Sequence, residues 1–274
     1  MRKIEIGHKG EKIPVLGQGT GGIQPHSPDE SYEKWKEVLK AGIEAGMTHI
    51  DTAEIYGFGK SERMIGDVIK NFDRDDLFIT TKLSPQHRDE KEMKLAVNNS
   101  LKRLGLKNVD LYLIHWIKRK QSIKQFINFL ERLIDEGKTR YIGVSNFSLD
   151  QFKTAQQETK KYELVTNQIK INIGYQTSLQ DSLTYYQKEG ILLTAYSPLG
   201  RYGLKKIPPY QMKKLERLTV KYKATPHQIA LAWLINHENI IAIPKTFNIE
   251  HVKQNAGAAE IQLTEDEISQ LSMK

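Results

Sequence analysis

The 274-residue chain contains no cysteine. This absence excludes disulfide bonds and thiolate metal sites, and it fits a reducing compartment. No run approaches the roughly 18 apolar residues that a membrane-spanning helix needs. The N-terminal residues, MRKIEIGHKG, lack the apolar core of a signal peptide. We therefore expect a cytoplasmic protein without a membrane segment.

Acidic residues are outnumbered, with 33 Asp and Glu against 41 Lys and Arg, which gives a net charge of +8. Such a balance raises the question of a nucleic-acid partner. The lysines, however, are interleaved with glutamates, as in EKWKEVLK and QMKKLERL, and the densest basic cluster is only IKRKQSIK at residues 117–124. This pattern predicts solvated helix faces and a general attraction for small anions, not a nucleic-acid site.

Short apolar runs rich in Val, Ile, Leu and Tyr recur along the chain, with little strict alternation. Such runs are typical of parallel strands that are buried on both faces. The eight predicted strands are residues 15–19, 47–51, 77–82, 109–116, 141–146, 164–168, 191–197 and 240–245.

Helical patterns with a polar start and an amphipathic body follow these runs, and many end at glycine. They cover residues 28–46, 61–72, 89–105, 122–137, 148–161, 178–190, 209–222 and 248–257. No linker-like segment interrupts the alternation. Eight β–α units in one chain predict a single domain over residues 1–274 with an α/β fold, the (β/α)8 TIM barrel.

Three segments fall outside this repeat. Residues 3–15 alternate and turn at Lys9-Gly10, which predicts an N-terminal β-hairpin across the bottom of the barrel. Residues 225–240 predict an extra amphipathic helix before the last strand, and residues 264–273 predict a helix near the end of the chain.

One motif, GQGTGG at residues 17–22, matches the dinucleotide fingerprint G-x-G-x-x-G. That fingerprint requires a helix that opens directly from the loop. Here IQPHSP follows, and its prolines delay any helix to about residue 29. No acidic residue ends a second strand about twenty residues later. A Rossmann site is therefore not expected.

Polar residues end most of the predicted strands, and in a (β/α)8 barrel these ends meet at one mouth where chemistry takes place. Taken singly, each such residue is better explained by packing or by a turn. An acid, a lysine and a histidine on three successive strand ends are harder to explain in this way. The strand-end residues are Gly19, Thr20, Asp51, Lys82, His115, Trp116, Ser145, Asn146, Gln168, Tyr196, Ser197, Lys245 and Thr246.

The physical coupling of these groups suggests a reaction. Lys82, at the end of an apolar strand, needs a counter-charge that Asp51 on the adjacent strand can supply. Tyr56 lies just beyond Asp51 in the glycine-containing loop YGFG, and a nearby ammonium is expected to lower its pKa from about 10. His115 can orient the oxygen that receives the proton. Such a site protonates a developing alkoxide, and it lacks a nucleophile–base pair and metal-ligand spacing, so the electrons must come from a cofactor.

Along essentially its whole length the chain resembles the aldo-keto reductase family, and within it the short microbial members. The resemblance rests on HIDTAEIYGFGKSE, ITTKL, DLYLIHW, GKTRYIGVSNF, NQI, AYSPLG and IPKT with HVKQNA, in the order and spacing of the family. It implies that an aldehyde or ketone is reduced to an alcohol by hydride transfer from NAD(P)H. It further implies a catalytic tetrad of Asp51, Tyr56, Lys82 and His115, with Tyr56 as the general acid.

The resemblance also implies the ligand contacts. Tyr56, His115 and Trp116 would face the substrate. Tyr196 would stack on the nicotinamide ring. The remaining expected coenzyme contacts are Gly19, Thr20, Asp51, Ser145, Asn146 and Gln168 at the nicotinamide end, Ser197, Leu199 and Gly200 over the pyrophosphate, Lys245, Thr246 and His251 at the adenosine phosphate, and Gln254 and Asn255 at the adenine. No metal ligand is expected.

The sequence departs from many relatives at several positions. Gly21 replaces an aromatic residue, which leaves the substrate pocket more open or filled from elsewhere, and HWIK replaces HWP. His251 stands where many relatives have an arginine, and a histidine carries little charge at pH 7. Lys245 remains, so NADP(H) is still favoured, with weaker selectivity over NAD(H). The chain stops at Lys274, without the C-terminal segment of longer relatives, which implies a permissive site for small carbonyl compounds.

Two other functions are compatible with these residues. Barrels of this family also serve as cofactor-binding regulatory or sensor subunits with slow or no turnover. A strand-end lysine such as Lys82 would suit a Schiff-base lyase, although pairing with Asp51 would keep it charged. A carboxylate-pair glycosidase is excluded, because Asp51 is the only clear strand-end acid. We expect a monomer without nucleic-acid or membrane partners.

Overall fold

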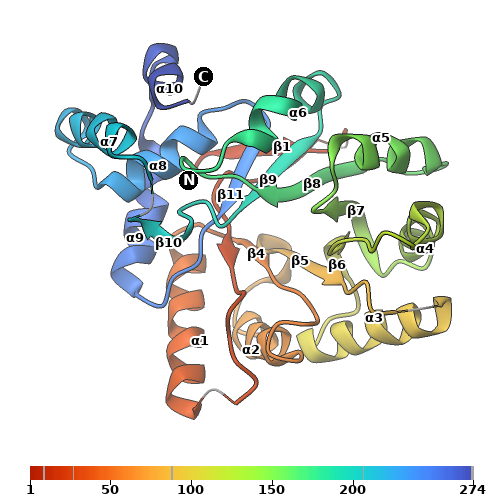
Figure 1. The fold of residues 1–274 in the computed structure, drawn as a ribbon. Helices are drawn as coiled ribbons and strands as arrows, with labels where there is room; N and C mark the ends of the chain where they lie inside the picture. The colour runs from red at the N-terminus through yellow and green to blue at the C-terminus, as the bar shows by residue number, and fades with distance from the viewer. Residues whose placement is uncertain (9, 27, 88, 206, 273–274) are drawn as a thin grey trace.

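The computed structural model describes residues 1–8, 10–26, 28–87, 89–205 and 207–272. At its centre, eight parallel strands form one sheet with the spatial order β11-β9-β8-β7-β6-β5-β4-β3 (Figure 1). The strands are β3 (Gln18–Gly19), β4 (His49–Asp51), β5 (Phe78–Leu83), β6 (Val109–Ile114), β7 (Thr139–Ser145), β8 (Leu164–Lys170), β9 (Leu192–Tyr196) and β11 (Ile240–Ile243).

The sheet closes on itself where the chain next to β3 meets β11. Leu16 forms a parallel bridge with Ala242. The Gly17 amide donates to the Ala242 carbonyl at 2.9 Å, and the Gly19 amide donates to the Pro244 carbonyl at 3.0 Å. The predicted (β/α)8 barrel is therefore confirmed, and every strand end reaches the same mouth.

Helices surround the strands in Figure 1, and each predicted helix is present. They are α1 (Asp29–Glu44), α2 (Lys60–Ile69), α3 (Glu90–Leu104), α4 (Ile123–Asp135), α5 (Leu149–Glu158), α6 (Thr177–Lys188), α7 (Pro209–Tyr222), α8 (Pro226–Ile235), α9 (Ile249–Gly257) and α10 (Glu265–Leu271), with short 3-10 turns at Arg74–Asp76 and Ala258–Glu260. A short strand that the sequence did not predict, β10 (Arg201–Leu204), follows β9.

The extra helix α8 differs from its prediction in length and character. It starts at a capping box in which the Thr225 and Gln228 side chains each accept from the other's backbone amide, which satisfies two otherwise free donors. It ends at Ile235, five residues earlier than predicted. Residues 229–235 are all buried. The expectation of an amphipathic helix was therefore wrong, because beyond its first turn α8 is covered on all sides.

The predicted hairpin is present as β1 (Lys3–Ile6) and β2 (Glu11–Pro14), which pair antiparallel. Lys9 of the predicted turn lies outside the described residues, and Gly10 has a φ of 75°. Ile6 and Ile13 pack with the apolar side chains inside the barrel. The hairpin therefore closes the N-terminal ends of the strands and leaves the opposite mouth for ligands.

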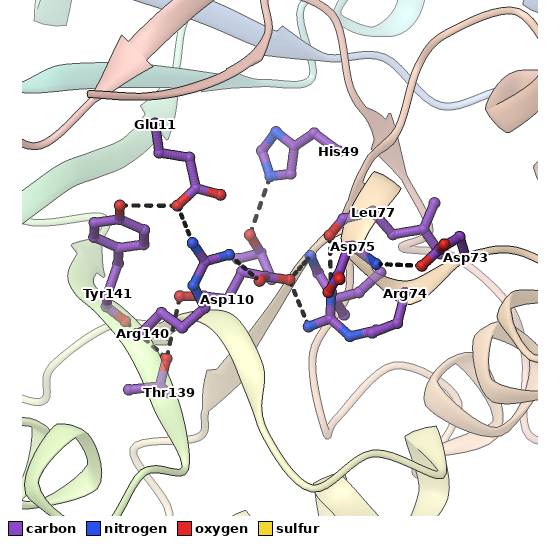
Figure 2. A network of polar contacts seen from close by, with 12 residues as sticks. Glu11, His49, Asp73, Arg74, Asp75, Leu77, Asp110, Thr139, Arg140 and Tyr141 are labelled. Carbon is purple, nitrogen blue, oxygen red and sulfur yellow. Dashed lines mark hydrogen bonds and ion pairs between the residues drawn. The ribbon is translucent and has the colours of Figure 1, made fainter. Parts of the chain in front are cut away.

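A network of polar contacts connects the hairpin to the barrel strands at this closed end (Figure 2). The buried Asp110 carboxylate accepts from Arg74 at 2.7 Å and from Arg140 at 2.9 Å, and it also accepts from the Ile79 amide. Arg140 reaches on to Glu11 of the hairpin. The carboxylate thus has a partner for each oxygen, as a buried charge requires.

Candidate active site

At the open mouth, Asp51 and Lys82 form a buried ion pair. The Lys82 ammonium donates to Asp51 Oδ1 at 2.5 Å and to the Thr52 carbonyl at 2.8 Å. The second oxygen of Asp51 accepts from Gln168 Nε2 at 2.7 Å. Burial acts to lower the pKa of Lys82, but Asp51 and Tyr56 outweigh it and raise the pKa above its ordinary value. Lys82 is therefore a fixed positive charge, and a Schiff-base role is disfavoured.

Tyr56 is held next to this pair by an unusual loop. Gly57, Phe58 and Gly59 have φ angles of 59°, 51° and 81°, three successive left-handed residues. Two glycines tolerate this conformation, and it folds the chain back so that the Ser61 amide donates to the Tyr56 carbonyl at 3.2 Å. The Lys82 ammonium lies 5.2 Å from the centroid of the Tyr56 ring.

The pKa of Tyr56 differs from the sequence-based expectation. Burial raises it, and the nearby charge of Lys82 lowers it without reversing the net increase. The expected net decrease was therefore wrong, because the sequence gives the proximity of the ammonium but not the loss of water around the phenol. The consequence favours proton donation, because Tyr56 stays protonated at neutral pH while Lys82 can stabilise the phenolate that forms.

His115 completes the group. Its ring lies edge-on to Tyr56, with centroids 5.6 Å apart, and 4.6 Å from the ring of Trp116. Burial and the charge of Lys82 lower the pKa of His115 to about 3, so the imidazole is neutral at pH 7. Its Nδ1 atom is buried without a partner among the described residues. A proton on Nε2 would give the mouth a neutral hydrogen-bond donor.

A second buried histidine, His49, lies two residues before Asp51 on β4, and it makes stability depend on pH. Its Nε2 atom is 3.0 Å from Thr80 Oγ1, and burial lowers its pKa to about 4. Below about pH 6.5 the unfolded chain binds a proton at His49, whereas in the folded chain His49 stays neutral. The free energy of unfolding therefore falls as pH decreases towards 4.

We expect His49→Gln to lose this contribution. Between pH 7.5 and 5, the free energy of unfolding of the wild type should fall by about 2 kcal/mol more than that of the variant. Urea denaturation at both pH values measures the difference, and groups other than His49 cancel in the comparison. Identical pH dependence in the two proteins would show that His49 is not kept neutral by burial.

A cavity of ≈ 600 Å³ opens in front of these residues, which we call the mouth cavity. Its volume is in the range of small-molecule sites. It contains most of the predicted site: Gly19, Asp51, Tyr56, His115, Trp116, Ser145, Asn146, Gln168, Tyr196, Ser197, Leu199, Gly200 and Lys245. Residues that are far apart in the sequence are thus brought together as the barrel topology predicted.

Six predicted residues do not line the mouth cavity. Lys82 is fully buried behind Asp51. Thr20 is also buried and donates to the Asp51 carbonyl at 2.8 Å. Thr20, Thr246 and Asn255 line a small neighbouring cavity behind Gly19. The last two, Gln254 and His251, lie on α9, and His251 Nδ1 is 3.4 Å from Thr246 Oγ1.

The mouth cavity also contains residues that were not predicted as contacts, among them Gly21, Gly22, Pro198 and Lys170. Lys170 is two residues beyond Gln168, and side chains at this spacing share one face of a strand. The predicted strand stopped at residue 168, whereas β8 continues to Lys170. A strand extended by two residues would have revealed Lys170.

The polar groups of the mouth cavity match a nicotinamide. Gln168 uses its Nε2 on Asp51, and its Oε1 has no partner among the described residues, so it can accept from a carboxamide. Ser145 and Asn146 lie beside it, with the Asn146 Nδ2 to Ser145 Oγ distance at 3.0 Å. Tyr196 is fixed by a 2.8 Å hydrogen bond from its hydroxyl to Asn146. Its ring is thereby held at the edge of the cavity.

A positively charged side chain, Lys245, lies on the other side of Gly19. Gly22 has a φ of 103°, and a Cβ built on it would lie 2.7 Å from Lys245 Nζ. The glycine therefore leaves room for the ammonium beside the cavity. In the part of the chain that the structure describes, no group of three or more His, Cys, Asp or Glu residues is arranged to hold a metal.

Fold and site together define a (β/α)8 barrel with an ionised Asp–Lys pair behind a tyrosine at its mouth. The sequence profile described as the aldo/keto reductase family matches residues 15–274. The chain belongs to this family. The family resemblance inferred from the motifs is thereby confirmed.

Individual relatives are similar over nearly their whole length. The chain is 31% identical over 261 residues to the methylglyoxal reductase YeaE of Escherichia coli, covering 94% of this chain and 90% of that protein. It is 32% identical over 267 residues to a 9,11-endoperoxide prostaglandin H2 reductase of Trypanosoma cruzi, covering 96% and 88%.

Solved structures show the same architecture. A thermostable aldo-keto reductase, Tm1743, in complex with the inhibitor epalrestat, superimposes with a TM-score of 0.93 at 39% identity, covering 99% of this chain and 98% of that one. An aldo-keto reductase of Klebsiella pneumoniae in complex with NADPH gives 0.89 at 32%, covering 98% and 93%. None of the helices in the described part of our chain is long and apolar enough to cross a bilayer.

Proposed function

We propose that this protein reduces aldehydes and ketones to alcohols with NADPH and that Tyr56 is the general acid. The observation that carries the proposal is the arrangement behind the mouth cavity: a protonated Tyr56 beside the Lys82–Asp51 pair, with the neutral His115 across from it. This arrangement supplies a proton and a hydrogen-bond donor but no nucleophile, which suits reduction and not hydrolysis.

The mechanism follows from these residues. A carbonyl oxygen held between Tyr56 and His115 accepts a hydrogen bond from each. When bound, NADPH supplies the hydride that adds to the carbonyl carbon. Tyr56 gives its proton to the oxygen as negative charge develops there, and Lys82 stabilises the resulting phenolate. Asp51 holds Lys82 in place and, by neutralising it, limits its effect on the pKa of Tyr56.

The coenzyme proposal rests on the fit of the cavity and on the family. Gln168, Asn146 and Ser145 offer amide and hydroxyl partners for a carboxamide, and Tyr196 offers a ring for stacking. Lys245, beside Gly22, offers a positive charge for a phosphate. Aldo-keto reductases of similar structure form complexes with NADPH or NADP. NADH remains an alternative coenzyme, because a histidine at position 251 lacks the fixed charge and the bidentate fork that an arginine would offer to a 2′-phosphate.

The substrate is proposed to be a small carbonyl compound. The related YeaE is named as a methylglyoxal reductase, and Gly21 leaves the space next to Tyr56 free, since a Cβ there would lie 3.3 Å from the ring. The test is turnover of NADPH with a panel of aldehydes and ketones, followed by product identification. Coenzyme binding without turnover of any carbonyl would instead indicate a sensor.

We expect Lys245 to determine the preference for NADPH. A hydrogen bond between a lysine and a phosphate should give roughly a 10- to 100-fold preference over NADH. Lys245→Ala should remove most of it and leave NADH binding nearly intact, whereas Lys253→Ala, an exposed lysine on the neighbouring α9, should not change it. The measurement is the ratio of the two Kd values. Tighter binding of NADH by the wild type would place the 2′-phosphate elsewhere.

A further inference from the structure

Lys170 is an exposed cation at the rim of the mouth cavity for which the proposed reaction gives no role. Within the described residues it makes no salt bridge. Its ammonium lies over the ring of Tyr175, 4.5 Å from the centroid, as a cation–π contact requires. The charge is thus held in position without being neutralised, and it remains available to an anion.

The turn that carries Tyr175 is itself fixed to the coenzyme side of the cavity. Asn172 and Tyr175 exchange two backbone hydrogen bonds, of 3.1 and 2.8 Å. The Asn172 side chain donates to the Ser197 carbonyl at 3.1 Å. Ser197 has a left-handed φ of 49° and begins the segment that lines the cavity up to Gly200. These hydrogen bonds fix the turn that carries Tyr175 relative to this segment. Because the Lys170 ammonium lies over the Tyr175 ring, its position relative to the segment is fixed as well.

The strand order shows on which side of the mouth Lys170 lies. Tyr56 follows β4, and His115 follows β6, so the proton-donating groups lie on one side of the mouth. Lys170 ends β8 and is in register with Tyr196 on β9, on the side that leads to Lys245 after β11. Lys170 thus belongs to the coenzyme half of the mouth.

The charge of the cavity supports an anionic ligand there. Among the described residues that line it, Asp51 is the only carboxylate, and Lys82 neutralises it. Lys170 and Lys245 have no such partner. Two separated cations match the two anionic groups of NADPH, the diphosphate in its middle and the 2′-phosphate on the adenosine ribose.

We propose that Lys170 binds the coenzyme diphosphate, a role that rests on the proposed use of a nicotinamide dinucleotide. Lys245 then distinguishes NADPH from NADH, while Lys170 contributes equally to both, because both contain the diphosphate. The two lysines are therefore separable by experiment.

The test is fluorescence titration of the wild type, Lys170→Gln and Lys170→Arg with NADPH and with NADH. Lys170→Gln should raise both Kd values by the same factor, about 3- to 10-fold for an exposed charge against a phosphate. Lys170→Arg should keep most of the affinity, because it keeps the charge. The difference between wild type and Lys170→Gln should shrink between about 0.1 and 1 M salt, where exposed charges are screened.

Lys188→Gln is the matched control, because Lys188 is exposed at the end of α6, where the chain has returned to the closed end of the barrel. It should bind both coenzymes as the wild type does. Unchanged Kd values in Lys170→Gln, or a loss confined to NADPH, would overturn the proposal. So would unchanged coenzyme binding with a raised KM only for 4-carboxybenzaldehyde relative to 4-nitrobenzaldehyde, which would make Lys170 a substrate contact.

Failure of the proposed function is seen separately, in the wild type. A wild type that binds both coenzymes but reduces no carbonyl would refute the reductase, while the comparison of Lys170 variants would still decide the diphosphate contact. A wild type that binds neither coenzyme would refute both.

Discussion

Tyr56→Phe is expected to bind NADPH normally and to lose most of its reductase activity. In the proposed mechanism the hydroxyl is the proton donor next to Lys82, and general acid catalysis contributes about 10²–10⁴ in rate. The ring remains, so its edge-on contact with His115 is kept. Single-turnover reduction, monitored by the loss of NADPH absorbance, measures the step without interference from product release.

Tyr32→Phe is a suitable control for this variant. It also removes one hydroxyl, which donates to Asp67 at 2.9 Å between α1 and α2, away from the mouth cavity. Its turnover should equal that of the wild type. If Tyr56→Phe kept more than about a tenth of the wild-type rate, the result would contradict the role of Tyr56 as the general acid.

The architecture was predictable because it depends on local patterns. Each strand of the barrel appeared as a mainly apolar run, since strands that are buried on both faces lack the regular alternation of polar positions that solvent exposure on one face would give. Once the barrel was inferred, its topology placed all strand ends at one mouth, and Asp51, His115 and Gln168 do line the same cavity. The sequence separation of these residues did not matter.

The errors arose where tertiary burial decides the outcome. Residues 225–240 were predicted to form an amphipathic helix, yet residues 229–235 of α8 are all buried. The pKa of Tyr56 was expected to fall because a cation was near, but desolvation is the larger effect. The side chain of Thr20 hydrogen bonds the Asp51 carbonyl, an environment that the sequence did not reveal, and its contact with the nicotinamide end stays a prediction. None of these environments is visible in a single sequence.

The remaining differences between prediction and structure concern where strands end. Lys170 was missed because the predicted strand ended at Gln168, whereas pairing with β9 continues two residues further. The short strand β10 was missed because RYGL lacks a distinct apolar run. Strand ends are set by partners across the sheet, and they are less certain from sequence than the existence of the strand.

Lys82→Met is expected to lower activity nearly as much as Tyr56→Phe, but through a different property. The substitution removes the ammonium that lowers the pKa of Tyr56, while burial and the Asp51 carboxylate, which both raise it, remain. The pKa of Tyr56 should therefore move further above its ordinary value. A weaker acid transfers its proton less readily, so reduction slows by about 10²-fold or more.

The pH profile separates this role from a structural one. In the proposed mechanism reduction depends on protonated Tyr56. Its rate therefore falls as pH rises through the pKa of Tyr56, and that decline should move to higher pH in Lys82→Met. Lys82→Gln, which can still donate to Asp51, should show the same shift, because it also lacks the charge. Thermal unfolding and NADPH titration establish that both variants fold. A profile with an unchanged decline would mean that Lys82 only holds Asp51 in place and does not act on the tyrosine.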